Sequence, residues 1–329
     1  MKVAVYSFHK FEKEYFSVPG NSKHELKFFE TRLNTDTVYL ATGCQAACIF
    51  VEDDGSAKVL EALNQQGIRY LVLRSAGYNH VDLAACKKLG IQVARIPDYS
   101  PYAVAEHAIT LMMALNRKII RAHQRVMDLN FSLDGLVGFD MNGKTAGIIG
   151  TGKIGKVAAK ILHGFGCKIL ANDALESEEL KNKYEVIYTD LKTLFSKADI
   201  ITLHVPLTEQ TKYLINNQSI ALMKRGVMLI NTSRGLLINT KEVIEGLKSG
   251  QIGSLGIDVY EEEEELFFED HSEDILQDDM IARLMSFRNV IITSHQAFLT
   301  DTALENIAKT TFYNLDCFEN NIISKNELK

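Results

Sequence analysis

The sequence TAGIIGTGKIG, residues 145–155, has the pattern of a strand that runs into a glycine-rich turn, and it is the best guide to the fold of this chain. Its first half is apolar, which is typical of a buried strand, and Gly150, Gly152 and Gly155 follow in the pattern G-x-G-x-x-G. The first glycine permits a tight turn, the second lets the backbone approach a pyrophosphate, and the third lets a helix pack on the strand. The N-terminus of that helix offers free N–H groups to the phosphates. The stretch therefore predicts a dinucleotide-binding turn.

The acidic residue Asp173 strengthens this prediction, because it ends the next predicted strand, residues 168–173. A carboxylate there accepts hydrogen bonds from both ribose hydroxyls and repels a 2′-phosphate, so NAD is favoured over NADP. A rival interpretation exists, because residues 150–156 also satisfy G-x-x-x-x-G-K, the first part of a P-loop. Val157 then stands where a P-loop needs Ser or Thr, so we expect the dinucleotide site.

Short apolar strands alternate with helical stretches both before and after this turn. Examples of the helical stretches before it are residues 56–66 and 81–89. The predicted strands are residues 2–7, 47–51, 70–75, 92–96, 146–150, 168–173, 199–205, 227–232, 254–260 and 289–294. This alternation predicts the α/β class, with two doubly wound parallel-sheet domains that divide near residue 100. A helix of about 25 residues is predicted after Pro101, long enough to lie between domains or subunits. A last helix is predicted over residues 304–319.

The composition excludes several classes of protein. The chain has 329 residues, 46% hydrophobic residues and a net charge of −6, which suits two domains and gives no reason to expect nucleic acid or an anionic membrane as a partner. No apolar run approaches the ~20 residues of a membrane span, and the N-terminus lacks the features of a signal peptide. Five scattered cysteines predict reduced thiols in a cytoplasmic protein, with neither disulfides nor a metal site.

Three groups suited to hydride-transfer chemistry follow predicted strands. Arg234 follows residues 227–232, the acidic run at residues 261–265 follows 254–260, and His295 follows 289–294. Ligands of doubly wound sheets bind at the carboxyl ends of the strands. An arginine can bind a 2-oxo acid carboxylate with two hydrogen bonds, an imidazole can donate a proton near neutral pH, and a carboxylate can orient that imidazole.

Several separated motifs together resemble the D-isomer-specific 2-hydroxyacid dehydrogenase family, in particular its NAD-dependent D-lactate dehydrogenases from fermenting bacteria. The likeness runs essentially from end to end. The motifs are G150-TGKIG155, H204-VPLT208, N231-TSRG235, G256-IDVYEEE263 and S294-HQAFLT300, with L73-RSAGYNHVDL83, V104-AEHA108 and L266-FFEDHSEDILQDD279.

The resemblance implies a role for individual residues. Arg234 binds the substrate carboxylate and carbonyl, His295 is the acid in reduction and the base in oxidation, and Glu263 pairs with His295. The five neighbouring glutamates leave a slip of one or two positions open. Asp258 is expected to face the nicotinamide amide. The other implied cofactor-binding residues are Thr151, Lys153, Ile154, Val205, Pro206 and Thr232.

The family also implies the substrate side and the architecture. Backbone N–H groups of Ala76 and Gly77 would bind the carboxylate, and three aromatic residues, Phe50, Tyr99 and Phe298, would line the substrate pocket. We expect a flavodoxin-like substrate domain, residues 1–100 with 300–329, and a Rossmann NAD domain, residues 101–299, with a cleft between them. The helix after Pro101 resembles the family's dimer-forming helix.

The activity expected from the resemblance is a cytoplasmic reduction of pyruvate to D-lactate with NADH, by a homodimer or homotetramer. Two alternatives stay open. One is a dehydrogenase for a bulkier 2-oxo acid, such as phenylpyruvate or a branched-chain acid, because an apolar pocket discriminates poorly between similar side chains. The other is an NAD-sensing protein without turnover, because a fold does not fix a function.

Overall fold

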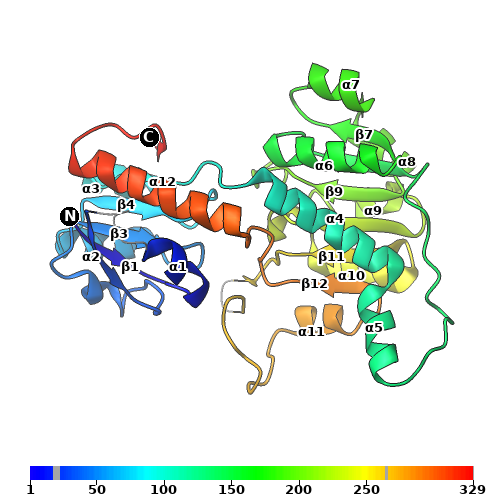
Figure 1. Ribbon diagram of the computed structural model, residues 1–329, viewed down its shortest axis with the longest axis horizontal. Helices are drawn as coiled ribbons and strands as arrows, with labels where there is room; N and C mark the ends of the chain where they lie inside the picture. The colour runs from blue at the N-terminus through cyan, green and yellow to red at the C-terminus, as the bar shows by residue number, and fades with distance from the viewer. Residues whose placement is uncertain (18–22, 264–265, 329) are drawn as a thin grey trace. The chain divides into compact units, whose positions relative to one another are not determined.

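The computed structural model describes residues 1–17, 23–263 and 266–328. It divides into two compact units (Figure 1). The first unit comprises Met1–Ser100 with Leu299–Lys329, and the second unit comprises Pro101–Phe298. Each unit is built on its own sheet, so the α/β class predicted from the sequence is confirmed.

The sheet of the first unit has the order β13-β5-β4-β3-β1-β2. Its strands are β1 (Lys2–Val5), β2 (Glu25–Phe28), β3 (Ala46–Ile49), β4 (Tyr70–Leu73), β5 (Gln92–Ala94) and β13 (Glu327–Leu328). All pairs are parallel except β13 with β5. The order of the first five strands along the sheet, 2-1-3-4-5, is that of a flavodoxin-like fold.

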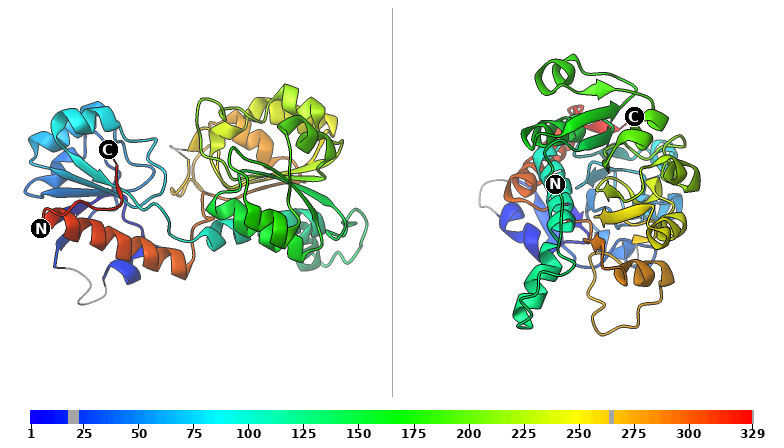
Figure 2. Two further views of the ribbon diagram at one scale, coloured as in Figure 1. Left: turned by 90° about the horizontal axis from the view of Figure 1, so that it is seen from above. Right: turned by 90° about the vertical axis from the view of Figure 1, so that its right-hand side faces the viewer.

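Two layers of helices cover this sheet, because successive strand residues point to opposite faces. Val3 and Val5 pack with Phe312 and Leu315 of α12 (Asp301–Glu319), whereas Ala4 packs with the opposite layer. That layer contains α2 (Ala57–Gln65), α3 (Leu83–Leu89) and the short helix η2 (Val38–Ala41). Figure 2 shows α12 on one face of the sheet and the light blue and cyan helices α2 and α3 on the other.

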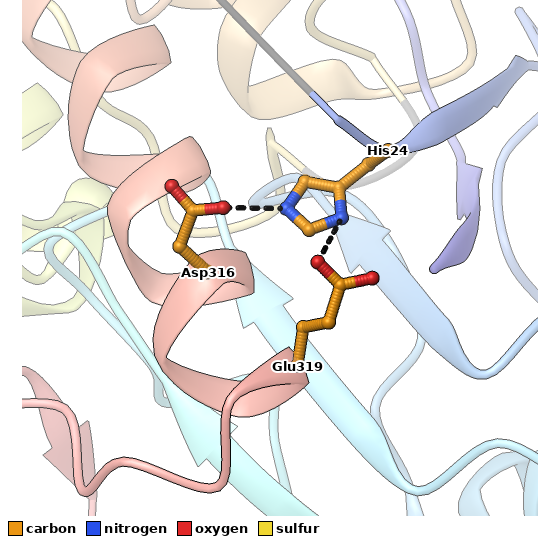
Figure 3. Close-up of side chains that lie close together, drawn as sticks. All are labelled: His24, Asp316 and Glu319. Carbon is orange, nitrogen blue, oxygen red and sulfur yellow. Dashed lines mark hydrogen bonds and ion pairs between the residues drawn. The ribbon is translucent and has the colours of Figure 1, made fainter.

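The C-terminal helix α12 therefore belongs to the first unit, whereas the residues up to Phe298 belong to the second. A cluster of charged groups ties it to the edge of the sheet at β2 (Figure 3). The buried imidazole of His24 lies with Nε2 3.2 Å from Asp316 Oδ1 and Nδ1 3.8 Å from Glu319 Oε2.

The sheet of the second unit has the order β12-β11-β10-β9-β6-β7-β8, and every pair is parallel. Its strands are β6 (Thr145–Ile149), β7 (Lys168–Asn172), β8 (Ile187–Tyr188), β9 (Ile200–Leu203), β10 (Val227–Asn231), β11 (Ile252–Ile257) and β12 (Val290–Ile292). Counted from β6, this is the Rossmann order 3-2-1-4-5-6 with one further strand. The strand order reverses between β6 and β9, which is where such sheets bind their ligands.

Helices cover both faces of the second sheet as well. One face packs against α4 (Pro101–Arg117) and α6 (Lys153–Gly164). The other face packs against α8 (Leu191–Lys197), α9 (Asn217–Leu222) and α10 (Thr240–Ser249). The remaining helices are α1 (Lys13–Phe16), α5 (Ile119–Met127), α7 (Glu178–Tyr184), α11 (Asp279–Met285) and the short η1 (Lys10–Glu12) and η3 (Gly235–Leu237).

The single long helix predicted after Pro101 is wrong. The helix begins at Pro101 as expected, but Lys118 adopts the left-handed conformation with φ of +51° and separates α4 from α5. The side chain of Asn116 explains where the change occurs, because it accepts from Phe139 N–H at 2.8 Å and donates to the Phe139 carbonyl at 2.7 Å. The returning chain therefore docks at the end of α4.

The sequence also led us to expect no membrane span and unpaired cysteines. Within the described residues, no helix is long and apolar enough to cross a membrane. All five cysteines are buried and free, so the prediction of unpaired thiols is confirmed.

Candidate active site

The glycine-rich turn has the geometry that its sequence predicts. Gly150 directly follows β6 and has φ of +92°, and a methyl group there would lie 2.5 Å from the His204 carbonyl oxygen. A methyl group on Gly155 would lie 2.0 Å from the Gly150 carbonyl oxygen, so this glycine lets α6 pack on the turn. At Gly152, the N-cap of α6, the same methyl group would meet nothing within 4 Å. The turn is therefore open toward a ligand only at its middle glycine.

The start of α6 also decides against a P-loop. Lys153 is its first residue and Ile154 its second, so Gly155 and Lys156 already lie in the helix. The glycine and lysine of a P-loop would instead close a longer phosphate-binding loop. The loop here is short, as in a dinucleotide-binding turn.

Asp173 lies directly beside this turn. Its Oδ2 accepts from Thr151 N–H at 2.5 Å and from Thr151 Oγ1 at 3.1 Å, and its Oδ1 accepts from Leu175 N–H at 3.0 Å. Burial acts to raise the pKa of Asp173, but these hydrogen bonds outweigh it and leave the pKa below its usual value. The carboxylate is therefore ionised at neutral pH, as expected of a group that binds ribose hydroxyls and repels a phosphate.

The ends of β9 and β10 complete the expected cofactor side. Val205 and Pro206 follow β9, and the Ser233 hydroxyl donates to the Val205 carbonyl at 2.7 Å, which ties the two strand ends together. Thr232 is buried, yet its Oγ1 has no hydrogen-bond partner among the described residues. An unpaired buried hydroxyl at a strand end fits a polar ligand such as the cofactor.

Arg234 follows β10 at the carboxyl edge of the sheet and is half-buried. Its Nη1 donates to its neighbour's carbonyl, that of Ser233, at 2.6 Å, and Asn231 holds its backbone by donating to the Arg234 carbonyl at 2.9 Å. In the described parts of the chain, no carboxylate pairs with this guanidinium. It is therefore an available cationic donor.

His295 and Glu263 lie side by side as expected, and their acid–base role stays a prediction. The His295 Nδ1 atom lies 2.9 Å from Glu263 Oε1, and the two side chains are 17% and 22% exposed. The other carboxylate oxygen, Oε2, accepts from Tyr260 N–H at 2.9 Å. Both oxygens of Glu263 are thus held, while the imidazole stays partly open to solvent.

The neighbouring glutamates differ in what they do. Glu261 Oε2 accepts from Thr240 N–H at 2.6 Å, at the start of α10, so this glutamate caps a helix. Glu262 is exposed. Glu264 and Glu265, which the sequence left open as partners of His295, lie outside the described residues.

Asp258 is fully buried and accepts hydrogen bonds from the loop that carries His295. Its Oδ1 accepts from Thr293 Oγ1 at 2.5 Å and from Gln296 N–H at 2.9 Å, and its Oδ2 accepts from Ala297 N–H at 2.9 Å. His107 of α4 lies 3.4 Å from the same Oδ1. A contact of Asp258 with the nicotinamide amide stays a prediction. Sequence reasoning missed the contribution of His107, although it lies in the motif V104-AEHA108.

The expected substrate residues lie at the carboxyl edge of the first unit's sheet, apart from Phe298, which ends the second unit. Ala76 and Gly77 follow β4, and their N–H groups donate to no other described residue. The buried ring of Phe50 follows β3 and lies 5.4 Å from the Arg74 guanidinium and 5.4 Å from the His9 ring. Tyr99 is held through its carbonyl, which accepts from Asn306 at 2.7 Å.

A buried ion pair beneath this edge was not predicted. The side chains of Arg74 and Glu12 are 0% and 2% exposed, with Nε 2.8 Å from Oε1. Arg74 also donates to the carbonyls of Tyr6 and Ser7 at 2.9 and 2.8 Å. It therefore fixes the ends of β1 and β4 against one another. The only signal in the sequence is a charged residue at the end of an apolar strand.

One group of possible metal ligands occurs among the described residues, namely His24, Asp316 and Glu319. Figure 3 shows that the two ring nitrogens of His24 face different carboxylates. A single metal ion would bind one ring nitrogen together with both carboxylates. Because each carboxylate faces a different ring nitrogen, the arrangement is that of an ion-pair cluster.

Comparison with known proteins agrees with this geometry. A family model described as "D-isomer specific 2-hydroxyacid dehydrogenase, NAD binding domain" matches residues 109–297. The D-lactate dehydrogenase of Escherichia coli strain K12 is 53% identical over 329 residues, 100% of each chain. The structure of a pyruvate reductase of Chlamydomonas reinhardtii is 42% identical with a TM-score of 0.94, covering 99% of this chain and 98% of that one. The structure of a D-2-hydroxyisocaproate dehydrogenase is 30% identical with a TM-score of 0.85, covering 100% and 99%.

The matched family model spans most of the second unit, including the glycine-rich turn, Arg234 and His295. NAD is accordingly the cofactor, as the turn and Asp173 predict. The likeness to the relatives extends over the first unit as well, because it covers the whole chain. The chain belongs to the D-isomer specific 2-hydroxyacid dehydrogenase family.

Proposed function

We propose that this chain is an NAD-dependent D-lactate dehydrogenase that reversibly reduces pyruvate to D-lactate in the cytoplasm. The observation that carries the proposal is the His295–Glu263 pair, at 2.9 Å, on the same sheet edge as the available guanidinium of Arg234. The full-length likeness to the E. coli D-lactate dehydrogenase supports pyruvate as the substrate. NADH supplies the hydride when bound.

Arg234 binds the carboxylate of the 2-oxo acid and polarises its carbonyl group. A guanidinium suits this role because its planar set of donors matches a carboxylate and its charge stabilises a developing alkoxide. The absence of a carboxylate partner among the described residues leaves these donors for the substrate. The N–H groups of Ala76 and Gly77 supply further donors for the same carboxylate.

His295 donates the proton in reduction and accepts it in oxidation. Because Nδ1 faces Glu263, Nε2 is the ring atom that serves the substrate. The carboxylate fixes the orientation of the imidazole, so Glu263 positions the donor without touching the substrate. Asp258 holds the backbone of the same loop in place.

The size of the substrate is limited by Phe50, Tyr99 and Phe298. Phe50 and Phe298 are buried, so their rings present fixed surfaces. Such a pocket separates acids that differ by a methylene by only about 10- to 200-fold. The second candidate, a dehydrogenase for a bulkier 2-oxo acid, is favoured by the likeness to the D-2-hydroxyisocaproate dehydrogenase.

The oligomer is a homodimer or homotetramer in which the segment from α5 to Val137 contacts a second copy. Eight large apolar side chains of this segment are exposed: Ile119, Ile120, Val126, Met127, Leu129, Phe131, Leu133 and Val137. Large apolar side chains that are exposed close together in sequence are typical of an interaction site. The likeness of the stretch after Pro101 to the family's dimer-forming helix supports a second copy as the occupant.

Loss of NADH absorbance in the presence of pyruvate tests the activity, and two variants test the roles. Arg234→Gln is expected to raise KM for pyruvate and lower kcat, and His295→Gln is expected to lower kcat at least about 100-fold. Variants with near-wild-type turnover would refute the assigned roles. NADH binding without turnover of any 2-oxo acid would refute the enzyme and favour a sensor.

A further inference from the structure

The acidic run opens a long loop that leads from β11 to α11 and is described over residues 261–263 and 266–277 (Figure 1). A hydrogen bond ties the base of this loop together. The hydroxyl of Tyr260, the residue before the loop, donates to Oδ2 of Asp278, the residue after it, at 2.6 Å. The second oxygen of Asp278 accepts from Met280 N–H and Ile281 N–H, which caps α11. The loop therefore begins and ends at one fixed point.

Of the two partners of this bond, Tyr260 is buried and Asp278 is half-buried. Tyr260 is 4% exposed and packs in an apolar cluster with Phe267, from within the loop, and Ile281 of α11. Burial and the adjacent carboxylate of Asp278 raise the pKa of Tyr260 well above its usual value. The phenol therefore keeps its proton and donates, and a hydrogen bond to a carboxylate is among the stronger kinds.

The backbone of Tyr260 contacts both loops that carry the expected catalytic groups. On one side, its N–H donates to Oε2 of Glu263, whose Oε1 faces His295. On the other side, its carbonyl lies against Gly235, the residue after Arg234, so closely that a methyl group on Gly235 would be 2.0 Å from the oxygen. A displacement of Tyr260 would therefore move Glu263 and disturb Arg234 together.

The far part of the loop returns to the same histidine. The ring of Phe268 lies 5.8 Å from that of His295 and tilts by 36°. Phe268 has φ of +70°, a conformation that a bulky residue keeps only when its surroundings hold it. The loop is thus attached at its base by Tyr260 and Asp278 and touches the imidazole further along.

We propose that Tyr260 and Asp278 are positioning residues for the reduction, because their hydrogen bond fixes the loop that sets Glu263 against His295. The inference rests on the proposed function, since it takes His295 as the proton donor. Neither residue contacts the reacting atoms. Their effect is transmitted through the Tyr260 backbone to the Glu263 carboxylate, and small displacements of such groups have large effects on rate.

Two variants remove the bond while preserving the packing around it. Tyr260→Phe deletes only the hydroxyl, and Asp278→Ser keeps an N-cap for α11 but is too short to reach the phenol. Tyr15→Phe is the matched control, because the Tyr15 hydroxyl donates to Asp301 Oδ1 at 2.9 Å in an exposed Tyr–Asp pair of the first unit. All assays are run well below the melting temperature of each variant.

We expect each variant to lower kcat for pyruvate about tenfold, with Kd for NADH within about twofold of wild type. This split between kcat and Kd separates a positioning role from a merely structural one. The double variant should lose no more activity than the single ones, because both remove one bond. Tyr15→Phe should match wild type in kcat and in Kd for NADH.

Wild-type kcat in Tyr260→Phe, with only the melting temperature lowered, would overturn the inference. Losses that multiply in the double variant would overturn it as well. This failure is distinct from failure of the proposed function, because the latter would appear as absent pyruvate turnover in the wild-type enzyme.

Discussion

The imidazole Nδ1 of His295 lies 2.9 Å from the carboxylate Oε1 of Glu263, although 32 positions separate the two residues in sequence. They follow neighbouring strands, β12 and β11. His295 itself has φ of +47°, an uncommon conformation for a non-glycine residue, and its N–H donates to the Asp258 carbonyl at 2.7 Å. Backbone strain at a functional side chain is typical of a preorganised site.

This relationship predicts that Glu263 matters for the rate and its exposed neighbour does not. Glu263→Gln should lower kcat for pyruvate reduction about 100-fold, because the imidazole loses the carboxylate that holds it in place. Glu262→Gln is the control and should resemble wild type. Equal kcat values for the two variants would contradict the pairing.

The glycine-rich turn predicts opposite effects at two of its positions. Gly152→Ala should leave the free energy of unfolding nearly unchanged but weaken NADH binding about tenfold, because the space it fills is open for a ligand. Gly155→Ala should destabilise the protein by about 1–3 kcal/mol, because its methyl group would meet the Gly150 carbonyl. Urea unfolding and NADH titration separate the two effects. If Gly152→Ala lost stability and kept NADH binding, the pyrophosphate would not bind at Gly152.

Asp173 predicts the choice of cofactor. Its lowered pKa keeps the carboxylate ionised at neutral pH, so it repels the 2′-phosphate of NADPH. Asp173→Asn should raise the ratio of kcat/KM for NADPH to that for NADH about tenfold. Asp190→Asn is the matched control, because Asp190 also has a lowered pKa but caps α8. If Asp173→Asn left this ratio unchanged, Asp173 would not be the residue that binds the ribose hydroxyls.

His204 predicts a loss of stability in mild acid. Burial lowers the pKa of His204 to about 4, whereas an unfolded histidine has a value near 6.5. The neutral form is thus favoured by folding, so its stabilisation is present above pH ~6.5 and is lost as the pH falls to about 4. Wild type should lose up to about 3 kcal/mol more than His204→Asn over this range. Parallel urea-unfolding curves for the two proteins would contradict this account.

The exposed apolar segment that begins at α5 predicts the state of association. Wild type should have at least twice the monomer mass of 36.9 kDa in light scattering. Phe131→Glu should shift it toward the monomer, because a charge cannot be buried unpaired in an apolar contact. Leu175→Glu, at another exposed apolar residue of the second unit, should leave the mass unchanged. A monomeric wild type would exclude this contact.

Much of the fold could be predicted because its central strands are continuous apolar runs. The strands that were missed carry weaker patterns. β2 is partly exposed along its length, and β8 and β13 have two residues each. The break at Lys118 could not be predicted either, because no glycine or proline marks it and the contact with Phe139 is distant in sequence.

The same distinction applies to the site. The sequence could place Arg234, the acidic run and His295 at one edge because each follows a strand, and parallel strands bring their carboxyl ends to one edge. The family resemblance was needed to single out Glu263 within the run. The pairing of Arg74 with Glu12, 62 positions apart, has no local pattern that would indicate it. The bond between Tyr260 and Asp278 depends on how a long loop closes, which the spacing of motifs does not specify.

The proposed reaction is the reduction of pyruvate to D-lactate by NADH. It is tested most directly by NADH oxidation with pyruvate, phenylpyruvate, 2-oxoisocaproate, hydroxypyruvate and glyoxylate, with chiral analysis of each product. We predict the highest kcat/KM for pyruvate and D-lactate as its only product. L-lactate, or no turnover of pyruvate by an enzyme that binds NADH, would contradict the claim. A preference for phenylpyruvate or 2-oxoisocaproate would keep the reaction and replace the substrate.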